Sequence, residues 1–260
     1  MLENGKWDGI VRILEEAEKQ RKAIPCLSLS HRFDIEEAYA IQEAWIAHKQ
    51  KEGDRAVGYK MGLTSPAKMK QMNVSEPVYG TLLASMLVEN GERLSYNSFI
   101  HPRVEAEVAF LLGRDLSGEN VTEKEVLEAT DHLMASIEII DSRYENFRFT
   151  LADVVADNAS SAKFVLGHRL VGAKKEEVAT FGMTLRINGE VKATGTPANV
   201  LGHPARSVAM LAKMLARKGE RLKAGDLVLT GGITEAIAVQ PGDVVQASFA
   251  HLGDVQVVFE

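Results

Sequence analysis

The hydrophobic residues near the start of the chain recur at helical spacing. They stand three or four positions apart with charged residues between them, at Trp7, Ile10, Val11, Leu14 and Ala17. A second helix is predicted to begin after Asp34, because this carboxylate can cap free backbone amides while Glu37 reaches back from three residues later. The first part of the chain is therefore expected to be helical.

From about Val57 onward the pattern changes to short strands. The apolar runs are broken by glycine and proline, and they read VGYKMGL, YGTLL, RVEAEVAFLL, MASIEIID, FGMTLRI, DLVLT, DVVQASF and VQVVF. Asn188 and Gly189 tolerate a positive φ and predict a two-residue hairpin. Two helices are expected among the strands, one capped by Thr122 with Glu125 and one over about residues 205–218.

The order of these elements predicts the fold class. Strands and helices do not alternate regularly, which argues against a doubly wound sheet or a barrel of βα units. We expect an α+β fold, in which a helical N-terminal part is followed by an antiparallel-rich mixed β body. The expected division is a helix-rich region over residues 1–90 and a β-rich catalytic domain over residues 91–260.

Composition narrows the classes of partner. The 260 residues are 45% hydrophobic and 25% charged, with 30 Lys and Arg against 36 Asp and Glu, so the formal net charge is -6. Such a chain has no general attraction to nucleic acid or anionic lipid, and we expect neither as a partner. A single cysteine, the lack of a basic and apolar leader, and the lack of a long apolar run predict a cytoplasmic protein without a membrane span.

The strand HPRVEAEVAFLLG carries the first candidate site. Period-two geometry places Glu105 and Glu107 on one face, with Cα atoms roughly 6.5 to 7 Å apart. Two carboxylates at about 7 Å repel by roughly 2.4 kcal/mol at an effective dielectric near 20. One interpretation is a solvated strand face with Arg103 as the partner. The other is an oxygen-rich site for a divalent metal.

A third carboxylate favours the metal site. Glu138 stands in the middle of the apolar run MASIEIID, where an unpaired buried carboxylate would be costly. Three carboxylates on two strands suit Mg²⁺ or Mn²⁺. Zinc is less favoured, because the histidines are scattered and no second cysteine accompanies them. Lys60, flanked by glycines in GYKMGLTS, is either an edge-strand lysine in water or a lysine that faces the anionic site.

With these segments in view, the chain resembles the hydratase and decarboxylase branch of the fumarylacetoacetate hydrolase superfamily. The resemblance runs almost end to end and rests on GYKMGLTS, EPVYGTLL, HPRVEAEVAF, IEIIDSRYENFRF, VADNASSAKFVLG, LGHPARSVAMLA and LTGGITEAIAVQPGD. It implies a fumarylacetoacetase-type fold, with Glu105, Glu107 and Glu138 as metal ligands and Lys60 as the active-site lysine. It also implies that Ser160 and the Thr230-Gly231 turn border the substrate.

The resemblance implies one of two closely related activities. One is decarboxylation of 4-oxalocrotonate (2-oxo-3-hexenedioate) in the meta-cleavage breakdown of aromatic compounds, and the other is hydration of 2-hydroxypenta-2,4-dienoate. The versions of DSRYENFRF and TGGITEA favour the decarboxylase. Val78 in EPVYG also favours it, since the hydratases tend to carry there an aspartate suited to activating water, although another carboxylate could serve.

Two other functions remain as alternatives. A dicarboxylate-binding module could use the same carboxylates without turnover. A C–C bond hydrolase of the parent superfamily would need a His–Glu pair to activate water, and neither His31 nor His48 has a partner evident from the sequence. The resemblance further implies a homo-oligomer and a complex with a partner hydratase, which would receive the unstable dienol.

Overall fold

The structure is a computed structural model that describes residues 5–65, 69–70, 74–173 and 177–260. Its described α-helices are α1 (Asp8–Gln20), α2 (Ile35–Lys51), α4 (Glu123–Ala129), α5 (Leu151–Ala156) and α6 (Pro204–Ala216). The predicted capping boxes are confirmed: Asp34 accepts from the Glu37 amide at the start of α2, and Thr122 accepts from the Glu125 amide at the start of α4. The apolar stripe of α1 is buried, as its spacing predicted.

The strands form two sheets. The larger one contains β1 (Ala56–Gly62), β2 (Val78–Leu83), β3 (Leu87–Val88), β5 (Arg103–Leu112), β6 (Thr130–Ile140), β7 (Ser161–Leu166), β10 (Leu227–Leu229) and β11 (Ile237–Ala238). Its strand order is β2-β1-β10-β5-β6-β7-β3, with β11 also paired to β5. Most of the pairs are antiparallel, while β1 with β10 and β3 with β7 are parallel. The mixed, antiparallel-rich body is therefore confirmed.

The smaller sheet has the order β4-β13-β12-β8-β9, from β4 (Arg93–Leu94), β8 (Met183–Ile187), β9 (Glu190–Gly195), β12 (Val244–Phe249) and β13 (Gly253–Phe259). The predicted hairpin joins β8 to β9, where Asn188 and Gly189 have φ of 55° and 79°. Positive φ at both central residues matches the right-handed twist of the strands that the turn connects.

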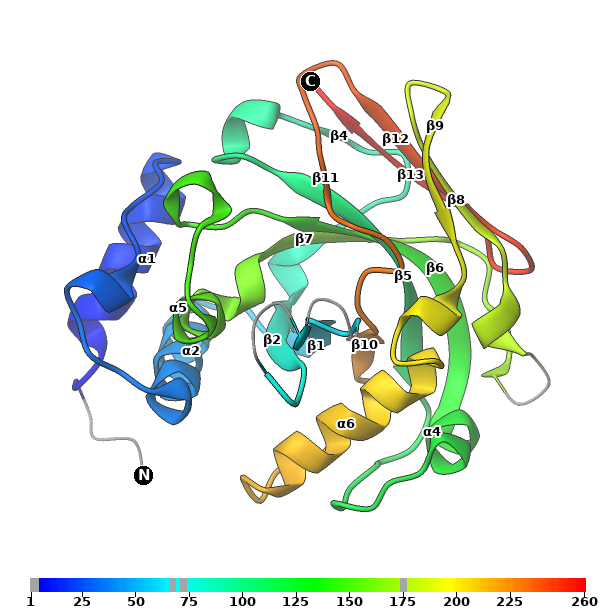
Figure 1. Ribbon diagram of the computed structural model, residues 1–260, viewed down its shortest axis with the longest axis horizontal. Helices are drawn as coiled ribbons and strands as arrows, with labels where there is room; N and C mark the ends of the chain where they lie inside the picture. Colours follow the sequence, from blue (N-terminus) through cyan, green and yellow to red (C-terminus); the bar gives the residue numbers. More distant parts are fainter. Residues whose placement is uncertain (1–4, 66–68, 71–73, 174–176) are drawn as a thin grey trace.

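Helices and the smaller sheet cover different parts of the larger sheet (Figure 1). The helices α1, α2 and α5 gather at one end, α6 and α4 lie along one side, and the smaller sheet lies at the far end from α1. The boundary near residue 90 stays a prediction. Strands from both sides of it, β1 to β3 and β5 to β7, belong to the same larger sheet.

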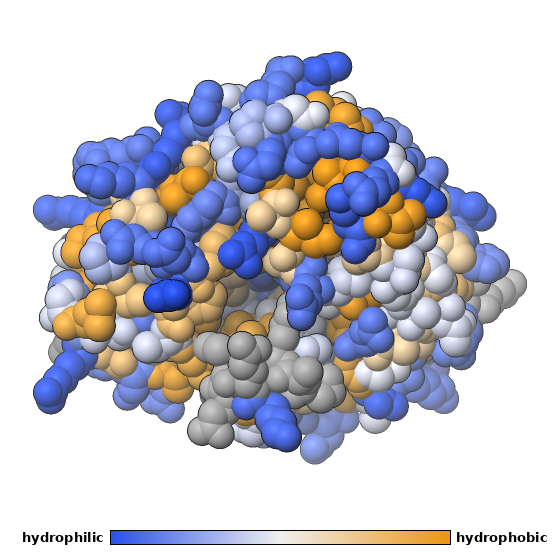
Figure 2. Space-filling model, turned by 45° about the horizontal axis from the view of Figure 1, so that its top comes forward, coloured by the Kyte–Doolittle hydropathy of each residue, from blue (hydrophilic) through white to orange (hydrophobic). Residues whose placement is uncertain are grey.

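The long strands at the centre are buried on both faces. Every residue of β5 from Val104 to Phe110 is buried, as is every residue of β6 from Leu133 to Ile139. The outer surface shown in Figure 2 is mainly hydrophilic, with smaller hydrophobic areas. No helix among the described residues has the length and apolar character that crossing a membrane requires. Because β5 and β6 are buried, the charged residues inside these strands are exceptional and need partners.

Candidate metal and substrate site

Three carboxylates meet where β5 and β6 pair. Glu105 lies directly opposite Glu138 in the antiparallel register, and Glu107 follows two residues later on the same face of β5. One carboxylate oxygen from each residue lies within 4.8 Å of the others. Glu107 and Glu138 are fully buried and Glu105 is 7% exposed. The strand pairing thus brings together the three residues that the sequence pattern singled out.

Lys60 approaches the carboxylates from β1. Its Nζ lies 2.9 Å from Glu138 Oε2 and donates a 3.2 Å hydrogen bond to the carbonyl oxygen of Ala159. Burial of the ammonium opposes its charge, but the three nearby carboxylates outweigh this effect and raise the pKa of Lys60. The lysine is therefore a charged donor inside the site, and the alternative of an edge-strand lysine in water is wrong.

Without a bound cation, it is energetically unfavourable to bury these three carboxylates side by side. Burial, followed by repulsion from Glu138 and Glu105, raises the pKa of Glu107 well above its ordinary value. Burial also raises the pKa of Glu138, against the opposing effect of Lys60. Among the described residues, Glu107 Oε1 and Glu138 Oε1 are buried acceptors without a hydrogen-bond donor. A hard divalent cation would supply the missing partner for these oxygens, so the donor set fits Mg²⁺ or Mn²⁺.

A pair of glycines allows the backbone to pass close to the carboxylates. The Gly231 amide donates a 2.7 Å hydrogen bond to Glu107 Oε2, and its φ of +106° is a conformation that glycine adopts readily. A Cβ on Gly231 would collide with the Thr64 side chain, and one on Gly232 would collide with the Glu105 carboxylate. This close approach explains why two glycines stand together after β10.

Not every residue of the predicted turn reaches the cavity. Thr230 is fully buried, and its hydroxyl donates to the Val108 carbonyl oxygen while its own carbonyl accepts from Ser207. Thr230 and Gly231 lie behind Glu107, whereas Gly232 lines the cavity. The substrate contact of Thr230 and Gly231 remains a prediction.

A left-handed turn forms another wall of the site. Asn158, Ala159 and Ser160 have consecutive positive φ values of 49°, 50° and 58°, a conformation that costs L-residues energy. The Asn158 side chain holds the turn, since it accepts from the Thr81 amide and donates to the Thr81 carbonyl oxygen. The result is that the Ala159 carbonyl faces Lys60 and that Ser160 lines the cavity.

The base of this turn is fixed by a buried ion pair. The Arg143 guanidinium is paired with the Asp157 carboxylate and also donates to the carbonyl oxygens of Asp141 and Asp157. Asp157 in turn accepts a 3.3 Å hydrogen bond from the Ser160 hydroxyl. The sequence motifs around these residues gave no sign of this arrangement, because the turn contains no glycine to mark its left-handed backbone.

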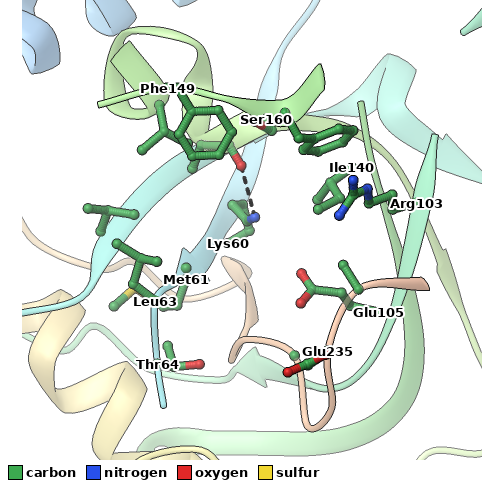
Figure 3. Close-up of a pocket in the computed structure, with 17 residues that line it drawn as sticks. Lys60, Met61, Leu63, Thr64, Arg103, Glu105, Ile140, Phe149, Ser160 and Glu235 are labelled. Carbon is green, nitrogen blue, oxygen red and sulfur yellow. Dashed lines mark hydrogen bonds between the residues drawn. The ribbon is translucent and has the colours of Figure 1, made fainter. Parts of the chain in front are cut away.

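Glu105 and Lys60 line a cavity of about 390 Å³, whereas Glu107 and Glu138 are fully buried and do not line it. Figure 3 shows that its two sides differ. Arg103, Glu105 and Glu235 lie on one side, with Lys60 near the middle, while Leu63, Met61 and Phe149 lie on the other. Val78 and Val154 add further apolar lining. The charged residues of the cavity therefore lie on one side, where Ile140 also lies, and the other side is mainly apolar, with Thr64 as a polar member.

The sequence pattern missed the role of several lining residues and gave Arg103 the wrong partner. We expected Arg103 to pair with Glu105 and Glu107 if the strand face were solvated, but this face is buried. Instead the Arg103 guanidinium lies 4.1 Å from the centre of the Phe147 ring. No spacing rule would have identified Phe147 or Glu235, because both come from irregular segments.

The expectation that His48 has no partner is also wrong. His48 Nδ1 lies 2.5 Å from Glu15 Oε1, and Glu52 lies near them, between α1 and α2. The sequence could not show this pair, because it depends on how α1 packs against α2. None of these three residues lines the cavity, so the pair offers no base for a water molecule held there.

Comparison with known proteins identifies the family. The sequence model of the family described as fumarylacetoacetate (FAA) hydrolase C-terminal matches residues 42–259. The chain belongs to this family. A 4-oxalocrotonate decarboxylase from Pseudomonas putida is 44% identical over 223 residues, which are 86% of this chain and 84% of that protein. A 2-keto-4-pentenoate hydratase from Dechloromonas aromatica strain RCB is 43% identical over 230 residues, 87% and 86% of the two chains.

A solved structure in the family closely matches the fold. It is 4-oxalocrotonate decarboxylase from Pseudomonas putida G7, complexed with magnesium and adipate. The TM-score is 0.93 and the sequence identity is 38%, with 97% of this chain and 98% of that chain covered. The expected fumarylacetoacetase-type fold is therefore confirmed.

Proposed function

We propose that the protein is a divalent-metal-dependent decarboxylase that converts 4-oxalocrotonate to 2-hydroxypenta-2,4-dienoate and CO₂ in meta-cleavage aromatic catabolism. The observation that carries the proposal is the buried group of three carboxylates beside Lys60, next to a cavity that Glu105 and Lys60 line and that also has apolar walls. The similarity to 4-oxalocrotonate decarboxylases in sequence and in fold supports it.

Glu105, Glu107 and Glu138 would hold the cation. When bound, the cation would act as a Lewis acid towards the carboxylate and 2-oxo oxygens of a 2-oxo acid. The protein holds its own part of the site rigidly: Glu105 and Glu138 are fixed by the strand register, and Glu107 by the Gly231 amide. Such preorganisation places the ligand oxygens before the substrate arrives.

Lys60 would stabilise negative charge that develops on the substrate. In the reaction the C5–C6 bond breaks, and its electron pair moves through the conjugated double bonds to the 2-oxo oxygen, which takes up one proton. An ammonium held between Glu138 and the Ala159 carbonyl can donate to that oxygen. In this role Lys60 acts as a hydrogen-bond donor and not as an amine nucleophile, so the reaction needs no Schiff base.

The apolar side of the cavity suits the departing carboxylate. Leu63, Val78 and Phe149 solvate a charged carboxylate poorly and tolerate neutral CO₂. Ser160 lines the cavity at the turn beside Lys60, where its hydroxyl can help to orient the substrate. Held in one conformer, the breaking bond can overlap the conjugated system.

Hydration of 2-hydroxypenta-2,4-dienoate is the second candidate, since a 2-keto-4-pentenoate hydratase is 43% identical. Hydration needs a group that activates water at the far end of the substrate, and Val78 offers no proton acceptor there. A dicarboxylate-binding module would bind the same ligand without turnover. We further propose that the enzyme is cytoplasmic, forms homo-oligomers and passes its dienol product to a partner hydratase, as the family resemblance implies.

The test is turnover by the purified protein with Mg²⁺. Both 4-oxalocrotonate and 2-hydroxypentadienoate are supplied, CO₂ release is measured, and substrate loss is followed by ultraviolet absorbance. We expect decarboxylation to exceed hydration by a wide margin. Faster hydration would support the second candidate, and binding without turnover would support the binding module.

Val78 provides a matched pair of variants. Val78→Asp should slow decarboxylation, because its charged side chain draws water to this wall, and that water solvates the departing carboxylate and lowers the energy of the ground state. Val78→Asn has nearly the same shape without the charge and serves as the control. Equal rates in the two variants would contradict the electrostatic role that we assign to this wall.

A further inference from the structure

Arg103 occupies a position that the reaction described so far does not use. It lies on β5 two residues before Glu105, and its half-buried side chain lines the charged side of the cavity. Its guanidinium lies over the Phe147 ring, and Phe147 also contacts the His101 ring, with centroids 4.5 Å apart. Figure 3 shows the guanidinium extending from β5 towards the cavity, on the same side as Glu105.

Among the residues that the structure describes, this arginine has no anionic partner. Its side chain takes part there in no ion pair and no hydrogen bond, and its guanidinium contacts the Phe147 ring. By contrast, Arg143 pairs with Asp157 and Arg217 pairs with Glu76. A flat guanidinium held on a ring, with its donors free, is suited to binding a carboxylate through two parallel hydrogen bonds.

The negative charge of the substrate favours a second positive side chain in the cavity, besides Lys60. The three carboxylates carry a charge of about -3, which Lys60 and one divalent cation would cancel. A dianionic substrate then adds two negative charges to the cavity, and the exposed Glu235 on its wall adds another. Among the described residues that line the cavity, Arg103 is the positive residue besides Lys60.

The two-sided cavity decides which end of the substrate Arg103 meets. The cation would hold the 2-oxo acid end at the carboxylates, and Arg103 is on that side. Leu63 and Phe149, which suit the departing carboxylate, lie on the other side. We propose that Arg103, held by Phe147, binds the 1-carboxylate of the 2-oxo acid. This inference rests on the proposed function and adds a specificity residue to it.

The test measures binding and uses two probes. Pyruvate carries the carboxylate and 2-oxo group alone, whereas 2-oxoadipate also carries a distal carboxylate and is the saturated analogue of the proposed substrate. Binding of each to the Mg²⁺-loaded protein is measured by titration calorimetry. The variants are Arg103→Met, which removes the charge, and Arg103→Lys, which keeps the charge but loses the planar fork. Arg93→Met is the control, since Arg93 is exposed on β4 and pairs with Glu260.

Arg103→Met should weaken both probes by a similar factor of about 10 to 100, the range for losing a hydrogen bond between charged groups. Arg103→Lys should weaken both by less, and Arg93→Met should change neither. Phe147→Leu should weaken both by about 2- to 5-fold, because the guanidinium loses its ring. Binding of Mn²⁺ to the ligand-free Arg103 variants should not become weaker.

Two results would overturn the inference alone. If both variants of Arg103 bind pyruvate and 2-oxoadipate as the unmodified protein does, Arg103 is only part of the wall. If they lose 2-oxoadipate but not pyruvate, Arg103 meets the distal carboxylate instead. An unmodified protein that binds neither probe in the presence of Mg²⁺ would overturn the proposed function together with this inference.

Discussion

Glu107→Gln should have opposite effects on stability with and without Mg²⁺. The substitution removes one negative charge from a fully buried site while keeping the shape of the side chain and an acceptor for the Gly231 amide. In the cation-free protein this relieves repulsion among the carboxylates. In the Mg²⁺-loaded protein it removes one of the three ligands.

The size of both effects follows from the structure. Two carboxylate charges 4.8 Å apart repel by about 3.5 kcal/mol at an effective dielectric near 20. Lys60 and proton uptake offset much of the repulsion, so we expect Glu107→Gln to stabilise the cation-free protein by about 2 kcal/mol. For a chain of this size that raises the melting temperature by roughly 4 to 8 °C.

Added Mg²⁺ should reverse the order. At 100 times its dissociation constant, a cation stabilises the unmodified protein by about 2.7 kcal/mol. If the loss of one ligand weakens binding about 100-fold, the same concentration stabilises Glu107→Gln by only about 0.4 kcal/mol. The melting curves of the two proteins should therefore change order when Mg²⁺ is added.

The assay is thermal unfolding with EDTA and with a series of Mg²⁺ concentrations. Glu119→Gln is the control, because Glu119 is exposed and the change alters net charge equally without touching the site. A Glu107→Gln protein that is less stable than the unmodified one in EDTA would refute the electrostatic reasoning. Equal stabilisation by Mg²⁺ in both proteins would refute Glu107 as a ligand.

Two further predictions concern protons and turnover. Because burial and neighbouring carboxylates raise the pKa of Glu107 in the cation-free protein, the folded state binds more protons than the unfolded state above about pH 4.3. The free energy of unfolding of the cation-free protein should thus fall as pH rises from there towards the raised pKa, while the affinity for Mn²⁺ rises. Glu107→Gln should flatten both trends. An Mn²⁺ affinity that does not change with pH would contradict this prediction. Lys60→Met should lower turnover by about 100-fold or more without weakening Mn²⁺ binding, as measured by steady-state kinetics and calorimetry, and unchanged turnover in the folded variant would remove Lys60 from the mechanism.

The carboxylates and the main elements were predictable because they depend on local periodicity. Alternation along β5 put Glu105 and Glu107 on one face, and the apolar run around Glu138 marked a buried charge that needs a cation. The capping boxes and the hairpin follow from residue types only a few positions apart. These features need no knowledge of how distant segments pack.

The remaining features depend on packing between distant segments. Lys60 reaches Glu138 because β10 places β1 near β5, an order that no local pattern contains. The left-handed turn at Ala159 is held by contacts with the distant Thr81 backbone. The contact of Arg103 with Phe147 was not predicted, since a strand pattern cannot show an aromatic ring that arrives from a distant segment.

Among relatives of this protein, the number of residues in β5 should vary far less than their identities. Arg103, Glu105 and Glu107 occupy alternate positions of one strand, and Glu105 faces Glu138 across the sheet. Deleting or inserting one residue between Arg103 and Glu105 would shift the alternation by half a period on one side of the change. The arginine and the two carboxylates would then lie on opposite faces of the sheet, and the site would lose one or the other. Relatives that keep this chemistry should therefore differ in this strand by substitution and take their insertions in the loops.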